Sequence, residues 1–295
     1  MNRPVISVLL PTYNGSAYLR EAVESISAQT FENWQLILID DASTDDTPSI
    51  IQEFMARDSR ICSCRHSTNR RLPAALNTGF QLARGDYISW TSDDNRYCET
   101  ALQEMLTALQ QDSSTHIVYA DFDCVHADGT HARHVHCGSQ EQLSLHNCIG
   151  ACFLYRREVQ EHLSGYREES VLAEDWDFWL RASQSFTMRH LPRSLYRYRL
   201  HEGSLTRQRQ HAIDVASRQV LERNLRDVTW KTNSHRSRSY FHLAKRSYRL
   251  GDVVSGSRQL ATSIYACPIT ALRELHALGR ESVTRLAGKL NKWAI

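Results

Sequence analysis

The 295-residue sequence lacks several features that would assign its class at once. No stretch approaches the roughly 18 to 20 apolar residues that a membrane-spanning helix needs. The first letters, MNRPVISVLLPTYNG, hold a short apolar run that meets Pro, Tyr, Asn and Gly. A strand entering a loop is expected there, rather than a signal peptide. Eight cysteines occur without a CxxC pair, so reduced thiols in a cytoplasmic protein are expected.

Glycine-rich phosphate-binding loops are also absent. Neither GxGxxG nor GxxxxGK[ST] occurs, which argues against dinucleotide-binding and P-loop proteins. The stretch PTYNGSAY after the first apolar run has no lysine, which disfavours nucleotidyl transfer. If a phosphate-bearing ligand binds this chain, a metal ion has to take the place of the glycine loop.

Charge is unevenly distributed along the chain. Residues 1–199 hold 18 Lys and Arg against 26 Asp and Glu, a net charge of −8. Residues 200–295 hold 17 against 7, a net charge of +10. This basic tail could contact an anionic membrane surface or pack on the acidic body. It carries no nucleic-acid reading motif, so no nucleic-acid partner is expected.

Apolar runs and amphipathic segments alternate over the first hundred residues. The pattern predicts strands at 5–11, 34–40, 61–67 and 86–91, with helices at 16–31, 43–58 and 72–84. Such alternation predicts an α/β fold whose mostly parallel sheet is covered by helices on both faces. Further strands are expected at 116–125 and 188–201, and only helices from about residue 206. We therefore expect two domains, 1–205 and 206–295.

Polar side chains gather where the predicted strands end, and ligands bind at this edge of parallel sheets. They are Thr12, Tyr13, Asn14, Asp40, Asp41, Asn69, Asp93 and Asp94. The adjacent Asp93 and Asp94 have two explanations. A turn would suit Asp and Asn, whereas a divalent cation would balance two like charges held side by side.

Five segments, in order, resemble family 2 glycosyltransferases of the Rossmann-like GT-A fold. They are SVLLPTYNG, IDDASTDDT, ALNTGFQLARGDYISWTSDDN, AEDWDFWLR and YRYRLHEGSLT, within residues 4–206. This family moves a sugar from a nucleotide-sugar to an acceptor with inversion at the anomeric carbon, aided by a divalent cation. The resemblance implies Mn²⁺ or Mg²⁺ as cofactor, a UDP-sugar as favoured donor and a glycan or lipid-linked acceptor. Polysaccharide biosynthesis is the implied setting.

The resemblance also implies which residues contact the donor. Tyr13 would pack near the nucleotide base, and Asp41 would accept the base's ring N–H. Gly150 would let the backbone approach the donor sugar, and Glu174 would also contact the donor. The alternatives are a helix-capping or turn carboxylate for Asp41 and a simple bulge for Gly150.

Metal binding and catalysis are implied for a second group. Asp93 would contact ribose and metal, and Asp94 and His201 would complete the metal's ligands. Thr91 stands where many members of the family have a first Asp, and a threonine cannot hold a metal as a carboxylate would. Asp175 would be the general base that takes the acceptor hydroxyl's proton. The alternative for Asp175 is a charge that stabilises a helix N-terminus.

Two other hypotheses stay open. The chain could be a catalytically inactive scaffold that binds a nucleotide-sugar or glycan on the same fold, and Thr91 is the feature that favours this. The stretch HADGTHARHVHC, with Cys148 and Cys152 beyond it, suggests zinc, but its spacings fit no standard ligand pattern. A solvated loop on the acceptor side is expected there. For the basic tail, peripheral attachment at the inner membrane face and packing on the acidic body both stay open.

Overall fold

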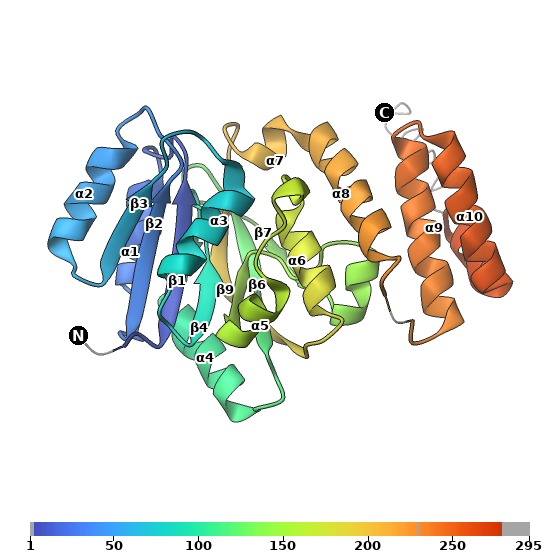
Figure 1. The fold of residues 1–295 in the computed structure, drawn as a ribbon, viewed down its shortest axis with the longest axis horizontal. Coiled ribbons are helices and arrows are strands. Elements are labelled where there is room, and N and C mark those ends of the chain that lie inside the picture. The colour runs from blue at the N-terminus through green and yellow to red at the C-terminus, as the bar shows by residue number, and fades with distance from the viewer. Residues whose placement is uncertain (1–2, 229, 279–295) are drawn as a thin grey trace, which may run out of the picture. The chain divides into compact units, whose positions relative to one another are not determined.

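The computed structural model describes residues 3–228 and 230–278 (Figure 1). The chain divides into two compact units, Met1–Ala216 and Ser217–Ile295. All of the site residues expected from the sequence belong to the first unit. Within the described ranges, no helix combines the length and the apolar character that crossing a membrane requires.

Over its described residues, the first unit is built on one nine-stranded sheet. The strand order is β3-β2-β1-β4-β8-β6-β9-β5, and β7 pairs with β6. The bounds are β1 Ile6–Thr12, β2 Trp34–Asp40, β3 Ile61–Arg65, β4 Tyr87–Trp90, β5 Arg96–Tyr97, β6 Ile117–His126, β7 His131–Val135, β8 Cys152–Arg156 and β9 Met188–Leu200. β3, β2, β1 and β4 are parallel, as are β6 and β9, whereas β8 runs antiparallel to both β4 and β6. The predicted mostly parallel sheet is confirmed.

Helices cover both faces of this sheet (Figure 1). In chain order as far as Asn224, the helices are α1 Leu19–Ser27, α2 Thr47–Arg57, α3 Arg71–Leu82, α4 Ala101–Gln111, α5 Arg157–Leu163, α6 Glu174–Ala182, α7 Leu205–Gln208 and α8 Gln210–Asn224, which crosses the boundary between the units, with 3₁₀ turns η1 Gln140–Ser144 and η2 Glu168–Ser170. Because side chains alternate along a strand, Ile6, Val8 and Leu10 join the apolar cluster formed with α1, α2 and α4. Leu9 points to the other face and lies against α3 at Gly79. β1 and β2 are buried along their whole length, as strands covered on both faces should be.

The first two helices begin later than the sequence pattern predicts, at Leu19 and Thr47. The intervening backbone is held by side chains of the neighbouring loop instead. The backbone N–H of Asn14 donates to Ser43 Oγ, that of Gly15 to Thr47 Oγ1 and that of Ser16 to Asp45. These bonds fasten the loops after β1 and β2 to each other, beyond the carboxyl ends of the strands.

The stretch expected to be a solvated loop contains strand β7, which forms a hairpin with β6. That expectation was wrong because β-pairing with β6 satisfies the backbone of this polar stretch, whose side chains alone suggested a loop. Asp128 supports the turn, accepting hydrogen bonds from both the backbone and the hydroxyl of Thr130.

The second unit is helical over its described residues, as predicted. α9 (Asn233–Arg249) and α10 (Val253–Ala266) are joined at Leu250, Gly251 and Asp252. Gly251 has φ +79, which glycine adopts readily, and Asp252 caps α10 by accepting the Ser255 N–H. The two helices contact each other through hydrogen-bonded polar side chains, such as Ser247 Oγ with Gln259 Oε1 at 2.7 Å.

Candidate active site

Asp93 lies directly over the loop that follows β1. Its Oδ2 accepts a hydrogen bond from the hydroxyl of Thr12, the last residue of that strand. A Cβ built at Gly15 would lie 2.0 Å from the same oxygen, so this approach requires a glycine. Burial, and next to it the charge of Asp94, raises the pKa of Asp93 to about 7. The carboxylate is therefore held in a place where its ionised form needs positive charge.

Asp94 meets His201 from the far end of β9, and their Oδ2 and Nε2 atoms are 3.0 Å apart. The other oxygen, Asp94 Oδ1, is buried and has no hydrogen-bond partner among the described residues. Buried polar atoms are rarely left unpaired, so this oxygen is free for a ligand. Asp94 thus contacts His201, and Asp93 lies close enough for the charges of both to influence its pKa, but only Asp94 and His201 have ligand atoms in direct contact. Carboxylate oxygens and an imidazole nitrogen are suitable ligands for Mn²⁺, and the oxygens also suit Mg²⁺.

Arg199 fixes the strand end that carries Asp94, a role that the sequence pattern did not reveal. Its side chain is 3% exposed, donates to the main-chain oxygen of Asp94, and bonds Glu21 at 2.6 Å. The guanidinium also lies over the Tyr18 ring, 4.5 Å from the centroid, and the same ring makes an edge contact with His201. A shared scaffold of Arg199 and Tyr18 therefore supports both Asp94 and His201. The only sequence signal for it is that Arg199 lies in the YRYRLH segment two residues before His201.

Thr91 is a core residue in this structure. Its side chain is buried, and its hydroxyl lies 2.6 Å from that of Tyr196. A carboxylate at this position would have to lose its hydration beside a buried tyrosine. This accounts for the departure from the family's first Asp without disturbing Asp93 or Asp94.

Glu174 and Asp175 begin α6, where Glu174 is buried and Asp175 is partly buried. Asp175 accepts hydrogen bonds from the backbone N–H of Trp176 and from Asn147 Nδ2, each at 2.7 Å. Burial raises the pKa of Asp175 above its usual value. Burial and the neighbouring Asp175 raise the pKa of Glu174 to about 8, and its Oε2 has no hydrogen-bond partner within the described ranges. The two donors thus stabilise the ionised form of Asp175, while its burial opposes ionisation.

Tyr198 connects the two carboxylate groups electrostatically. Its pKa is raised by burial and then by the charges of Asp94 and Asp175, while its hydroxyl bonds Thr206. It was not predicted from the sequence, where an alternating tyrosine in a strand is ordinary. The charges of Asp94 and Asp175 thus act on one partly buried tyrosine.

The residues expected to contact the nucleotide are arranged around the same sheet edge. Tyr13, directly after β1, is half exposed, as is expected of a side chain that packs near a nucleotide base. Asp41 is buried and accepts the backbone N–H groups of Arg70 and Arg71 at 2.8 Å, while His66 Nδ1 lies 2.7 Å from it. It therefore holds the start of α3, the alternative left open by the sequence. Contact of these side chains with a donor stays a prediction.

Gly150 has φ +74 in the loop before β8, and a Cβ there would lie 2.7 Å from the Phe122 ring. Phe122 in turn packs 5.9 Å from Tyr198, measured between ring centroids. The glycine thus lets the loop come close to the ring that supports Tyr198. One open pocket of about 560 Å³ lies beside His201, and its lining includes Tyr18 and His126.

Residues 7–164 match the family model for glycosyl transferase family 2. The chain belongs to this family. An uncharacterized glycosyltransferase of Rickettsia prowazekii is 25% identical over 319 residues, covering 98% of this chain and 96% of that protein. Two longer relatives are 30% identical: an uncharacterized protein of Sinorhizobium fredii, covering 78% of this chain, and the O-antigen biosynthesis protein RfbC of Myxococcus xanthus, covering 73%. The chain spans only 26% and 17% of their lengths, respectively.

Solved structures agree on the fold. Staphylococcus aureus TarS 1–349, in complex with UDP-GlcNAc, aligns with a TM-score of 0.61 at 14% identity over 92% of each chain. The mannosyltransferase PcManGT of Pyrobaculum calidifontis, in complex with GDP-Man and Mn²⁺, aligns with a TM-score of 0.62 at 17% identity, covering 96% of this chain and 81% of that one. The chain has the GT-A fold expected from its sequence.

Proposed function

We propose that this chain is an inverting, metal-dependent glycosyltransferase. It would transfer a hexosyl group from a nucleoside-diphosphate sugar to a glycan or lipid-linked acceptor by single displacement. The observation that carries this proposal is the contact of Asp94 with His201 beside Asp93, with Asp94 Oδ1 left unpaired among the described residues. That arrangement suits a cation better than a turn.

Asp93, Asp94 and His201 would hold Mn²⁺ or Mg²⁺ in this site. When bound, the ion supplies positive charge that stabilises the leaving nucleoside diphosphate. Arg199 keeps the backbone of Asp94 in place, and Thr12 keeps the Asp93 carboxylate directed over Gly15. The adjacent carboxylates, which repel each other without a counter-ion, are explained by this role.

Asp175 would act as the general base. Its raised pKa makes it a better proton acceptor than an exposed aspartate, while the Trp176 N–H and Asn147 Nδ2 stabilise its ionised form. It would take the proton of the acceptor hydroxyl as that oxygen attacks the anomeric carbon opposite the leaving group. Inversion then needs no covalent intermediate and no enzymic nucleophile.

Tyr13, Asp41, Gly150 and Glu174 are proposed to contact the donor, with a UDP-sugar favoured. The complexes of TarS with UDP-GlcNAc and of PcManGT with GDP-Man and Mn²⁺ support a nucleotide-sugar and a divalent cation on this fold. The name of RfbC supports polysaccharide biosynthesis as the setting.

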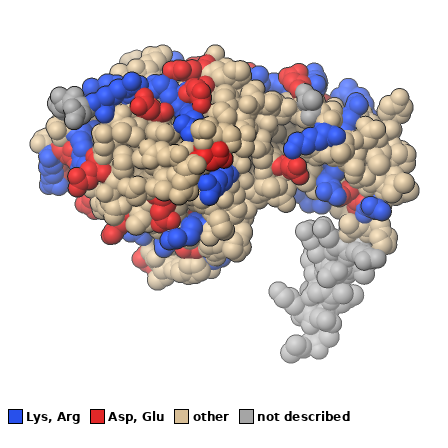
Figure 2. All heavy atoms as spheres, turned by 90° about the horizontal axis from the view of Figure 1, so that it is seen from below, with Lys and Arg blue, Asp and Glu red and all other residues tan. Residues whose placement is uncertain are grey.

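A cytoplasmic enzyme with peripheral contact to the inner membrane face is proposed. Residues 217–278 carry 11 Lys and Arg against 4 Asp and Glu. Val254 and Tyr265 of α10 are more than four-fifths exposed, which would add apolar contact with lipid. On the face shown in Figure 2, basic side chains stand singly or in small groups rather than in one continuous patch. Attachment would thus depend on summed charge and on these apolar side chains.

A donor screen with Mn²⁺ present tests the proposal by following release of the nucleoside diphosphate. We expect metal-dependent release with one class of nucleotide-sugar, slow without acceptor and faster with it. The inactive-scaffold alternative predicts donor binding without release under all conditions. Its one structural argument, the loss of a carboxylate at Thr91, is weakened by that residue's place in the core.

A further inference from the structure

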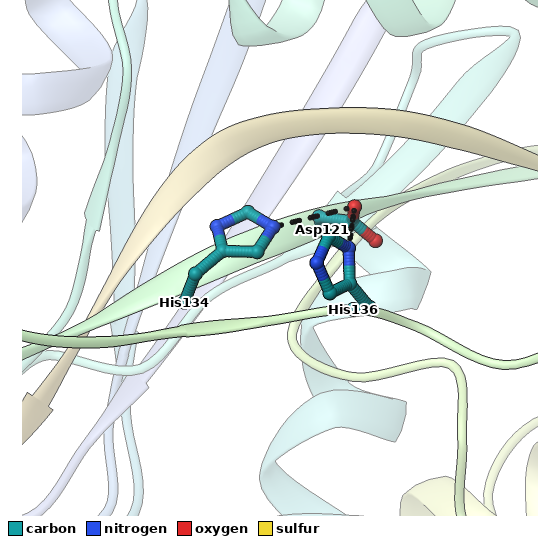
Figure 3. Close-up of side chains that lie close together, drawn as sticks. All are labelled: Asp121, His134 and His136. Carbon is teal, nitrogen blue, oxygen red and sulfur yellow. Dashed lines mark hydrogen bonds and ion pairs between the residues drawn. The ribbon is translucent and has the colours of Figure 1, made fainter.

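The β6–β7 hairpin carries a second cluster of metal-binding side chains, separate from Asp93, Asp94 and His201. Asp121 and Asp123 lie on one face of β6, and His134 and His136 lie on one face of β7, because residues two apart in a strand point the same way. The strand register sets Asp123 opposite His134. Both imidazole rings approach the Asp121 carboxylate (Figure 3).

Three ligand atoms converge at this point. Asp121 Oδ2 lies 3.5 Å from His134 Nε2 and 3.1 Å from His136 Nδ1, and the three atoms lie within 4.8 Å of one another. Two metal–ligand bonds of about 2.1 Å at a tetrahedral angle would separate their ligand atoms by about 3.4 Å. The observed separations lie on either side of this value. The Asp121 side chain is 2% exposed and that of His136 is 80% exposed, so the site is anchored on its inner side and open to solvent.

Neighbouring groups fix which atoms face the centre of the cluster. Asp123 Oδ1 lies 2.7 Å from His134 Nδ1, which makes Nδ1 the protonated nitrogen of a neutral ring and turns the lone pair of Nε2 toward Asp121. Asp121 Oδ1 is occupied by the backbone N–H of Cys137 and by His190 Nε2 at 2.6 Å, leaving Oδ2 to face the two rings. Two acceptor atoms, Nε2 of His134 and Oδ2 of Asp121, would thus face each other without a proton between them. A carboxylate that orients a histidine in this way is the usual outer shell of a metal site.

We propose that Asp121, His134 and His136 bind a Zn²⁺ ion, with water in the remaining position. Two imidazoles and one carboxylate form a ligand set that zinc accepts with an open position. The ion would tie β7, which pairs only with β6 among the described strands, to the sheet. His190 would extend this tie to β9 through Asp121. The proposal is independent of the sugar-transfer function.

A protonated cluster is the competing explanation. A hydrogen bond to Asp123 raises the pKa of His134, so an imidazolium could face Asp121 instead of a metal. The cysteines near this stretch take no part in either the zinc or the protonated arrangement. Cys137 Sγ lies 3.2 Å from the Ala120 carbonyl and 3.1 Å from that of Ile149, and it is not among the converging atoms.

The test is Zn²⁺ binding by the full-length, tag-free chain after removal of metals by a chelator. It is run on the Asp94→Ala variant, so that zinc at the proposed donor site is not counted. Equilibrium dialysis followed by metal analysis should give one tightly bound Zn²⁺ per chain. His136→Ala, at a largely exposed position that should not impair folding, should weaken this binding by 10-fold or more, and Asp123→Asn by about 10- to 100-fold through loss of His134 orientation.

His211→Ala is the matched control, since His211 is an exposed histidine on α8, outside the three converging residues and, within the described ranges, without a hydrogen bond or ion pair to Asp123. It should leave the Zn²⁺ affinity within about 3-fold of the parent, a difference well below the outer-shell effect. Co²⁺ in place of Zn²⁺ should give visible absorption bands that disappear in His136→Ala. Absence of stoichiometric Zn²⁺ in the parent, or equal binding by His136→Ala, would show that the cluster is only protonated.

Discussion

Replacing Asp175 by Asn should slow sugar transfer by about 10²- to 10⁴-fold, the range usual for a general base. This corresponds to a loss of about 3 to 5 kcal/mol of transition-state stabilisation. Donor affinity should stay close to that of the wild type, because in the proposed mechanism Asp175 acts on the acceptor hydroxyl. The effect should therefore appear in kcat rather than in donor binding.

The structure indicates that this substitution leaves the fold intact. The amide oxygen of an asparagine can still accept the Trp176 N–H, as Asp175 Oδ1 does. Its NH₂ group would meet Asn147 Nδ2, but a flip of the Asn147 amide would present Oδ1 instead. That oxygen is buried and has no hydrogen-bond partner among the described residues. One flip therefore restores the pairing with position 175 and moves the Asn147 NH₂ group to the place that the oxygen held, so the circular dichroism of the variant is compared with that of the wild type.

The assay measures single-turnover release of the nucleoside diphosphate at saturating donor, together with the donor Kd from calorimetry. Asp112→Asn is a matched control, the same change at a carboxylate at the end of α4 that bonds Ser114 and Thr115. It should leave both quantities within 3-fold of wild type. A collapse of donor affinity in Asp175→Asn, with little further loss in the chemical step, would refute the reasoning and make Asp175 a binding residue.

Asp94→Ala should abolish Mn²⁺-dependent donor binding, measured by calorimetry. The far-UV circular dichroism should not change, which shows that the fold is intact. Undiminished Mn²⁺-stimulated turnover in this variant would contradict the metal assignment. For Glu174, folding raises the pKa from 4.5 to about 8, so the folded chain keeps a proton that the unfolded chain has lost. The free energy of unfolding should therefore fall as pH rises from about 5 to 8, by on the order of a few kcal/mol, and Glu174→Gln should flatten that slope in urea titrations. The basic helices should bind anionic liposomes at low salt, where screening is weakest, and release them in high salt. Co-sedimentation measures this binding. If the chain does not bind anionic liposomes at low salt, the tail has a purely structural role.

Patterns in the sequence predicted the sheet and its edge well. Continuous apolar runs identified β1 and β2 as strands covered on both faces, because burial on both faces leaves no alternation. Polar residues after each strand identified the edge that holds Asp93 and Asp94. Helix starts were predicted too early because Asn14, Gly15 and Ser16 bond side chains from another loop. Such contacts between segments leave no local periodicity.

The supporting residues were not predictable for a related reason. Arg199 reaches Glu21, 178 positions away, and Tyr198 is influenced by Asp94 and Asp175 together. Each lies in a strand whose alternating arginines and tyrosines look like a solvated face. Likewise, the histidines of β7 could not be assigned without the register that sets them beside Asp121 and Asp123. Family motifs indicate which residues react, whereas the fold decides which others hold them.

Thr91 can be tested directly as the one departure from the family pattern. Thr91→Val removes the partner of the buried Tyr196 hydroxyl, which should lower the free energy of unfolding by about 1 to 3 kcal/mol. Adding Tyr196→Phe removes the unpaired hydroxyl as well, so the double variant should recover most of that loss. Mn²⁺ affinity should stay at the wild-type value in both variants, because Thr91 contacts Tyr196 and is not a proposed ligand. Denaturant unfolding and Mn²⁺ titration of the wild type and the two variants separate a packing role from a metal role. Weakened Mn²⁺ binding in Thr91→Val, not restored by Tyr196→Phe, would place Thr91 in the metal site after all and revive the inactive-scaffold alternative.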